Sequence, residues 1–282
     1  MRFDYEKTAV VTGAAKGIGR EICLALARDG WKLGIVDIDL DAAEETRGLI
    51  EKAGGTGEVF RCDVANPEEV AACAEHFFAA WGKVGLLVNN AGIMVAGCVE
   101  DVSVEDWRRI VDVNLMGVIY GCRAYVPGMK RQGGGHIVNV ASMAGMITLF
   151  EQAPYNTTKA AIIGLSETLR MELSPHNIRV TVACPLCLNT NLLETARINS
   201  DFIAEFYRTS FTQARMSAAA IAGCILRAVE KNKFYEMPQP FAKLLWVNKR
   251  LTPAQFLDIF SLLNRRGLGK PVAMWLARHG LA

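Results

Sequence analysis

Short β-branched, apolar runs alternate along this chain with longer stretches in which apolar residues recur at helical spacing. The short runs predict buried strands over 8–12, 32–36, 59–62, 85–88, 136–140 and 179–183. The longer stretches predict helices over 18–29, 41–53, 67–81, 104–132 and 155–173. This alternation predicts an α/β fold, a doubly wound and mostly parallel sheet with helices on both faces.

Several of the predicted helix ends carry local signals. Asn66 precedes Pro67 as an N-cap before a proline at the first helical position. The segment 103–106 (Ser-Val-Glu-Asp) has the form of a capping box. Near the C-terminus, Thr252 and Pro253 are expected to open a helix that Gly267 closes.

Charge divides the chain into two unequal parts. The 282 residues carry a net charge of +2, which gives no sign of a nucleic-acid-binding protein. Residues 241–282 hold seven Lys or Arg and one acid, Asp258, between apolar residues. We therefore predict a main domain over 1–240 and a basic, apolar helical extension over 241–282.

Cysteine usage and hydropathy bear on the cellular setting. The eight cysteines are scattered through apolar segments, as buried free thiols are, and no disulfide framework is expected. The N-terminus has no signal-peptide pattern, and no segment offers 18 consecutive apolar residues. The expected location is the cytoplasm. Cys184 and Cys187 form a C-x-x-C pair, but no second pair of ligands stands near it in sequence, so no metal site is predicted.

A glycine-rich turn joins the first strand to the first helix. It contains Gly13, Gly17 and Gly19, with Lys16 and Ile18 between them, and such a turn lets backbone N–H groups approach a pyrophosphate. Asp37, at the end of the second strand, would accept hydrogen bonds from an adenosine ribose and repel a 2′-phosphate, which favours NAD. Lys16 favours NADP instead, and we give Asp37 more weight. Asp39 is expected to be a solvated loop residue.

Further candidate cofactor residues follow the third and fourth strands. Asp63 and Val64 are placed to cap an adenine, and Asn90, Ala91 and Gly92 are small or polar where a cofactor must lie close. Taken singly, each segment is equally well explained as an Asx turn.

A tyrosine and a lysine stand one helical turn apart. Tyr155 and Lys159 share a helix face, and Ser142 precedes Tyr155 by 13 residues. A free phenol has a pKa of about 10, and a nearby ammonium group should lower that pKa enough for Tyr155 to act as a general base. Ser142 would hydrogen-bond the oxygen at the reacting carbon.

These motifs together resemble the classical short-chain dehydrogenase/reductase family. TGAAKGIG at 12–19, CDV at 62–64, NNAG at 89–92, Asn114, Ser142 and YNTTK at 155–159 occur in the family's order over about residues 5–235. The resemblance implies one Rossmann-like domain with about seven parallel strands and a catalytic set of Asn114, Ser142, Tyr155 and Lys159. It also implies that Asn114 orients a water, and that Pro185 and Thr190 contact the nicotinamide. Leu186 stands where the family usually has glycine.

Apolar side chains fill the positions that the resemblance assigns to substrate. Met94, Met143, Leu186 and Leu192 are the candidates, within a substrate loop that extends over about 186–215, and the nearby Glu151 is expected to be exposed. We therefore expect an NAD-dependent oxidoreductase for an apolar secondary alcohol or ketone, such as a steroid, terpenoid, aliphatic or aromatic compound. The alternatives are an NADPH-dependent reductase of ketones or 3-oxoacyl thioesters, and a non-catalytic cofactor-binding sensor or scaffold.

Two expectations concern partners. The resemblance implies a homodimer or homotetramer. The extension over 241–282 could cover the pocket, wrap a neighbouring subunit or lie on an anionic membrane surface. Packing on its own domain is the favoured interpretation.

Overall fold

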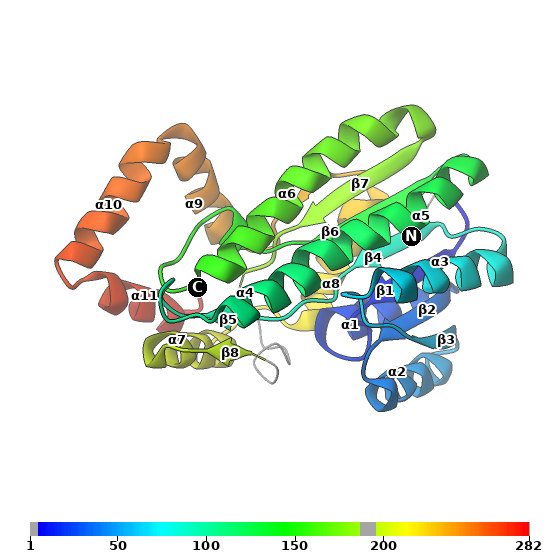
Figure 1. Ribbon diagram of the computed structural model, residues 1–282, viewed down its shortest axis with the longest axis horizontal. Helices are drawn as coiled ribbons and strands as arrows, with labels where there is room; N and C mark the ends of the chain where they lie inside the picture. Colours follow the sequence, from blue (N-terminus) through cyan, green and yellow to red (C-terminus); the bar gives the residue numbers. More distant parts are fainter. Residues whose placement is uncertain (1–4, 187–195, 282) are drawn as a thin grey trace.

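A seven-stranded sheet forms the centre of the protein (Figure 1). The computed structural model describes residues 5–186 and 196–281. All strand pairs of this sheet are parallel. In spatial order the strands are β3 (Thr56–Arg61), β2 (Lys32–Asp37), β1 (Thr8–Thr12), β4 (Leu86–Asn89), β6 (Gly135–Val140), β7 (Ile178–Ala183) and β9 (Tyr235–Glu236). The predicted fold class and the six predicted strands are confirmed.

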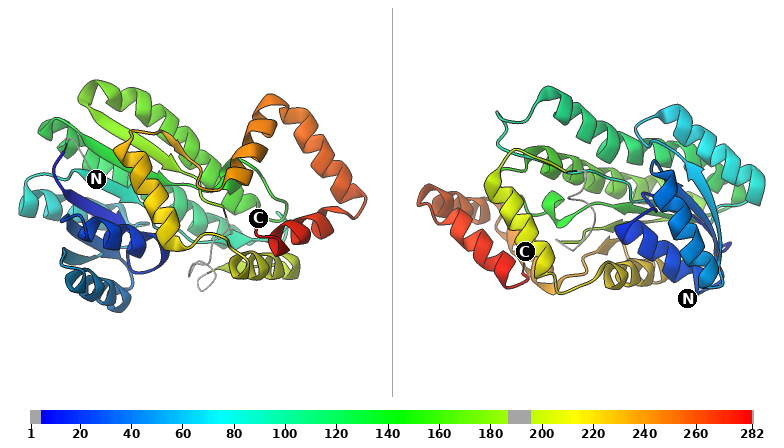
Figure 2. Two further views of the ribbon diagram at one scale, coloured as in Figure 1. Left: turned by 180° about the vertical axis from the view of Figure 1, so that it is seen from behind. Right: turned by 90° about the horizontal axis from the view of Figure 1, so that it is seen from below.

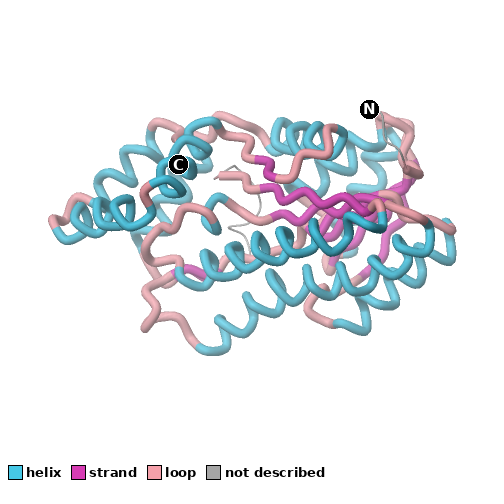
Figure 3. The backbone as a smooth tube through the Cα atoms, turned by 90° about the horizontal axis from the view of Figure 1, so that it is seen from above, coloured by secondary structure: helices cyan, strands magenta, loops and turns pink. Residues whose placement is uncertain are grey.

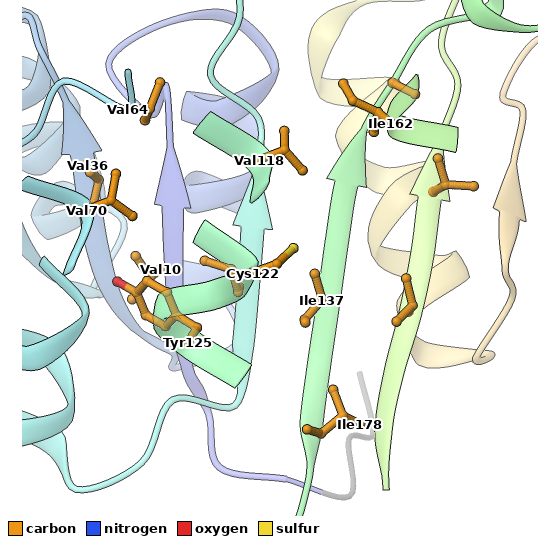
Figure 4. Close-up of a cluster of buried hydrophobic side chains, with 14 of the residues drawn as sticks. Val10, Val36, Val64, Val70, Val118, Cys122, Tyr125, Ile137, Ile162 and Ile178 are labelled. Atoms are coloured by element: carbon orange, nitrogen blue, oxygen red, sulfur yellow. The ribbon is translucent and has the colours of Figure 1, made fainter. Parts of the chain in front are cut away.

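Helices cover both faces of the sheet (Figures 1 and 2). One face carries α3 (Pro67–Trp81), α5 (Gly117–Gln132) and α6 (Ala153–Leu173), and the other carries α1 (Gly17–Ala27), α2 (Leu40–Lys52) and α8 (Ala218–Glu230). Alternate residues of β1 pack against the helices on opposite faces of the sheet. Val10 belongs to the cluster with Tyr125 shown in Figure 4, whereas Val11 packs with Ile22 of α1. Burial on both faces explains why the strands are continuous apolar runs.

The strand order reverses direction at the middle of the sheet. From β1 the chain moves outward to β2 and β3, then returns to β4 on the other side of β1. The loops after β1 and β4 therefore separate at the carboxyl edge, where open α/β sheets bind their ligands. The glycine turn and the segment 89–92 are those two loops.

The helix predicted over 104–132 is interrupted. It consists of α4 (Val104–Val111), a π-helical turn η1 (Asp112–Met116) and α5. Apolar periodicity continues through all three segments, so the sequence pattern alone does not reveal the break. Asn114 lies within the π-helical turn, a feature common at functional sites.

The structure confirms Asn66 and Ser103 as helix N-caps, whereas Thr252 precedes α10 (Pro253–Arg265) without a side-chain cap hydrogen bond. Asn66 Oδ1 accepts from the backbone N–H groups of Glu68 and Glu69, and Ser103 Oγ accepts from that of Asp106. The Asp106 carboxylate pairs with Arg197 of the short strand β8 (Arg197–Ile198), which lies beside β5 (Val95–Ala96).

Two helices and the seventh strand were not located from the sequence. α7 (Asp201–Thr212) and α8 begin after Ser200 and Ser217, whose hydroxyls cap them and were usable signals. β9 has only two residues, too few for a periodic pattern.

The C-terminal region is helical, as predicted. It contains α9 (Pro240–Leu251), α10 (Pro253–Arg265) and α11 (Gly269–Arg278). Gly267 follows α10 with a φ of 72°, as expected of a closing glycine. The three helices project from the end of the sheet that bears the carboxyl edge (Figures 1 and 3). From there, α11 returns to pack beside α7. Within the described residues, no helix is long and apolar enough to cross a membrane.

Candidate active site

The glycine turn is built so tightly that side chains would not fit. Gly13 and Gly17 have φ values of 63° and 57°, a region that glycine enters at little cost. A Cβ on Gly19 would lie 2.2 Å from the Gly13 carbonyl oxygen. The first N–H groups of α1, which as in any helix have no partner within the helix, therefore lie at an open, positively polarised turn that suits a pyrophosphate.

Asn90 fastens this turn to the end of β4. Its Nδ2 donates to the Thr12 and Gly13 carbonyl oxygens at 2.9 and 3.0 Å. Thr12 Oγ1 in turn accepts from the backbone N–H groups of Asn90 and Ala91. The loops that follow β1 and β4 are thus held together by these hydrogen bonds.

Asp37 stands at the end of β2 with its carboxylate held in place. Its oxygens accept from the Ala15 N–H at 2.9 Å and the Asp39 N–H at 3.1 Å. Lys16 Nζ lies 3.5 Å from the Asp39 carboxylate. Asp39, expected to be only solvated, also caps α2 by accepting from the Ala42 N–H.

Tyr155 and Lys159 lie near the start of α6 and are both buried. Lys159 Nζ is 5.7 Å from the centroid of the Tyr155 ring and donates to the Val140 carbonyl oxygen at 3.0 Å. Burial lowers the pKa of Lys159 from 10.5 to about 8. Its charge is therefore sensitive to pH near the alkaline end of the physiological range.

Ser142 follows β6 and begins the short turn that packs on α6. Its Oγ accepts from the Ala144 N–H at 3.1 Å and lies 3.4 Å from the Pro185 carbonyl oxygen. The short turn η2 (Met143–Gly145) presses against α6, because a Cβ on Gly145 would lie 2.5 Å from the Lys159 carbonyl carbon. Close packing of this turn fixes Ser142 relative to the Tyr155 helix.

Asn114 is fully buried. Its Oδ1 accepts from the Ile93 N–H at 2.8 Å, and its Nδ2 donates to the Ile93 carbonyl oxygen at 2.9 Å. A Cβ on Gly92 would meet both Asn114 Oδ1, at 3.2 Å, and Lys159 Nζ, at 3.5 Å. The side chain thus ties η1 to the β4 loop beside Lys159, and its orientation of a water stays a prediction.

A cleft of about 780 Å³ connects these groups along the carboxyl edge of the sheet. Most of the predicted cofactor and catalytic residues line it: Gly13, Lys16, Gly17, Ile18, Asp37, Asp63, Val64, Asn90, Ala91, Gly92, Ser142, Tyr155, Lys159 and Pro185. Gly19 and Asn114 instead support the wall. Glu105, Arg108, Arg109 and Asp112 also line the cleft, although no sequence signal singled them out.

The cleft fits a dinucleotide on structural grounds. The glycine turn suits the pyrophosphate, the held Asp37 carboxylate suits a ribose, and Gly92 leaves room beside Lys159 and Asn114. Such a cofactor would lie between the glycine turn and Tyr155.

The predicted substrate residues separate into three groups. Leu186 lines the cleft and also a smaller cavity of about 120 Å³, whose lining includes Met143. Leu186 adopts no positive φ, and its N–H donates to Gln239 Oε1 at 3.1 Å. Met94 is fully buried in a cluster with Tyr155 and Ile110 and lines neither cavity. Thr190 and Leu192 lie outside the described residues.

Glu151, expected to be exposed, is enclosed. Its side chain is 13% exposed and pairs with Lys270 of α11 at 2.9 Å. Burial would raise its pKa, but hydrogen bonds from Ser200 and Lys270 lower the pKa below its ordinary value. The sequence does not show this pair because its partners are 119 residues apart.

The thiol at Cys184 is not activated. Burial raises its pKa to about 12, so the thiol stays protonated, and Cys187 lies outside the described residues. Among residues 5–186 and 196–281, no cluster of His, Cys, Asp or Glu is arranged to hold a metal ion.

Comparison with known proteins identifies the family. A family model described as short chain dehydrogenase matches residues 7–201. The chain belongs to the short-chain dehydrogenase family. Dehydrogenases of this family are oxidoreductases.

Curated relatives extend the likeness beyond the matched segment. "Probable oxidoreductase EphD" of Mycobacterium tuberculosis is 36% identical over 252 residues, which are 86% of this chain and 43% of that protein. The chain therefore spans less than half the length of that relative. Cyclohexanol dehydrogenase of Acinetobacter is 36% identical over 188 residues, 66% of this chain and 75% of the relative.

Solved structures share the fold. A short-chain dehydrogenase/reductase from Burkholderia phymatum in complex with NAD superposes with a TM-score of 0.83 and 30% identity, covering 87% of this chain and 93% of that one. Solved relatives have been determined with NAD and with 5-hydroxy-NADP. The family thus uses either cofactor.

Proposed function

We propose that the protein is an NAD-dependent dehydrogenase that interconverts an apolar secondary alcohol and its ketone. The observation that carries the cofactor assignment is the Asp37 carboxylate, held at the end of β2 by the Ala15 and Asp39 N–H groups. A 2′-phosphate would meet this negative charge. Lys16, the nearby cation that would favour a 2′-phosphate, lies 3.5 Å from the Asp39 carboxylate.

The residues at the far end of the cleft can perform the proton chemistry. When bound, the nicotinamide cofactor accepts or supplies the hydride. The Tyr155 hydroxyl takes the proton from the alcohol during oxidation and returns it during reduction. Protonated Lys159 favours the phenolate form of Tyr155, and Ser142 Oγ donates a hydrogen bond to the substrate oxygen.

The substrate class follows from the apolar lining near Ser142. Leu186 and Met143 lie beside Ser142, and the smaller cavity is lined mainly by apolar side chains. The likeness to a cyclohexanol dehydrogenase supports a neutral, cyclic or aliphatic secondary alcohol. The main cleft carries charged residues, among them Arg108 and Arg109 of α4, whereas none of the described residues that line the smaller cavity is charged.

Two other functions remain as alternatives with distinct expectations. An NADPH-dependent reductase of ketones or 3-oxoacyl thioesters would require that Lys16 outweigh Asp37. A sensor or scaffold would bind the cofactor without turnover, which the presence of Ser142, Tyr155 and Lys159 together argues against.

Calorimetric titration with NADH and NADPH tests the cofactor assignment. The wild type should prefer NADH, and Asp37→Asn should reduce that preference at least roughly tenfold, the effect of about 1.4 kcal/mol. Asparagine keeps an oxygen for the Ala15 N–H, and Asp41→Asn, in the first turn of α2, serves as a charge-matched control. Preference of the wild type for NADPH would favour the reductase alternative.

Oxidation of cyclohexanol with NAD tests the reaction. Tyr155→Phe should lower kcat by about 10²- to 10⁴-fold while NADH affinity is retained. Equal turnover by the wild type and Tyr155→Phe would remove Tyr155 from the mechanism. Absence of turnover in the wild type with any alcohol or ketone, despite cofactor binding, would favour the sensor.

The remaining proposals concern organisation. We propose that residues 1–240 form the catalytic domain and 241–282 an extension of it, in a homodimer or homotetramer that binds no nucleic acid. We also propose a cytoplasmic location, because the described cysteines are all free thiols.

A further inference from the structure

The smaller cavity lies between the catalytic domain and the C-terminal helices. We call it the C-terminal chamber. It has a volume of about 120 Å³, and its walls include Met143 and Gln152 on one side and Leu263, Val272 and Leu276 of α10 and α11 on the other. Ser142, Leu186 and Tyr207 line both this chamber and the main cleft, so the two spaces meet at Ser142.

The chamber suits an apolar group. An engineered cavity of roughly 150 Å³ lined by Leu, Ile and Phe stays dry and binds benzene, and the C-terminal chamber is of similar size and lining. Its polar component is small: Gln152 Oε1 accepts from the Tyr207 hydroxyl at 2.6 Å. Gln152 Nε2 is buried without a hydrogen-bond partner, so its N–H groups can donate to an oxygen of a bound molecule.

Polar ties hold the C-terminal helices over the chamber. Lys249 of α9 donates to the Met146 carbonyl oxygen at 2.7 Å, and Lys270 of α11 pairs with Glu151 at 2.9 Å. At the end of the chain, Arg215 donates to the His279 carbonyl oxygen at 2.7 Å. Met146 and Glu151 belong to the segment that follows Ser142, so both ties connect the extension to the chamber wall itself.

These contacts distinguish the possible roles of the extension. The extension packs on its own subunit. Its residues on α10 and α11 line the same chamber as Ser142. We infer that residues 241–282 complete the substrate site: the C-terminal chamber receives the apolar body of a secondary alcohol or ketone whose oxygen lies at Ser142 and Tyr155. This inference rests on the proposed function for the position of the reacting oxygen.

The inference predicts a dependence on chain length. Each methylene that enters the chamber should raise kcat/KM roughly fourfold, the equivalent of about 0.8 kcal/mol. Among 2-alkanols from 2-butanol to 2-decanol, kcat/KM with NAD should therefore rise until the chamber is filled. Val272→Phe, which adds volume to the α11 wall, should reduce the ratio of the values for 2-octanol and 2-butanol at least tenfold.

A matched control is available on α10. Leu262 is 44% exposed and does not line the chamber, whereas Leu263 next to it does. Leu262→Phe adds bulk to the same extension and should leave the length dependence unchanged. If Val272→Phe affects short and long alcohols equally, or the wild type shows no length dependence, the inference is wrong and the proposed reaction stands.

A binding measurement tests the C-terminal chamber independently of the proposed reaction. With NAD present, 2-decanone should raise the Tm of the wild type and of Leu262→Phe, and raise that of Val272→Phe much less. This pattern without turnover of any alcohol would support the chamber and overturn the proposed reaction. Equal stabilisation of Val272→Phe and the wild type would overturn the chamber.

Discussion

Lys159 Nζ donates to the Val140 carbonyl oxygen across 3.0 Å in a buried position. This contact places the ammonium group under the Tyr155 ring and gives it a polar partner at the end of β6. Burial nevertheless dominates, and the pKa of Lys159 falls to about 8. The same desolvation makes the charge that assists Tyr155 titratable.

A pH-dependent contribution to stability follows from that pKa. Below about pH 8 the folded protein must keep a buried charge, whereas between about 8 and 10.5 only the unfolded chain remains protonated at this site. Stability should therefore rise with pH across this window by up to about 3 kcal/mol relative to Lys159→Met. Urea unfolding of both cofactor-free proteins from pH 7 to 10 measures the difference. A difference that is constant with pH would contradict the lowered pKa.

The space around Gly19 of the glycine turn and around Gly48 of α2 predicts opposite effects for the two glycine-to-alanine changes. In Gly19→Ala, the new Cβ would lie 2.2 Å from the Gly13 carbonyl oxygen, a backbone atom. Stability should fall by about 1–3 kcal/mol, and NADH affinity should fall at least roughly tenfold as the turn shifts.

Gly48→Ala is the control for this change. Gly48 is also helical, and its Cβ would meet nothing within 4 Å, so alanine should stabilise α2 by about 0.5–1 kcal/mol. Urea unfolding and NADH titration measure both variants. Normal NADH binding by Gly19→Ala would show that the turn has room to spare.

Tyr207 and Gln152 form a buried pair beside Ser142. Tyr207→Phe removes the donor to Gln152 Oε1 and should destabilise the protein by about 1–3 kcal/mol, because the amide oxygen stays buried. Adding Gln152→Leu should recover part of the loss, giving a coupling of about 0.5–3 kcal/mol in a double-mutant cycle. Strict additivity of the two unfolding free energies would show that the hydrogen bond contributes nothing.

The Lys270–Glu151 pair should make the extension sensitive to salt. Lys270 is 52% exposed, so Lys270→Met should cost only about 0.5–1 kcal/mol. This cost should shrink in 1 M NaCl, where screening acts over about 3 Å. In Lys270→Met, amide hydrogen exchange should become faster in α11 than in α6. Lys243→Met on α9 is the control, and an equal response to salt in both variants would argue against the tie.

Local chemistry made much of the candidate site predictable. The i, i+4 spacing places Tyr155 and Lys159 on one helix face, and glycine spacing after a strand identifies the turn at 13–19. The N-caps Asn66 and Ser103 are likewise local hydrogen bonds that a short segment specifies by itself. The parallel sheet follows because fully buried strands must be continuous apolar runs.

Only the tertiary structure decided which distant residues meet. It placed Lys16 against Asp39, inserted a π-helical turn at Asn114 and enclosed Glu151 with Lys270. Lys249 reaches Met146 across 103 residues of sequence, closing a chamber that no motif describes. Such contacts depend on the packing of whole layers, in which many small contributions are summed, and the sequence carries no periodic or local signal for their partners.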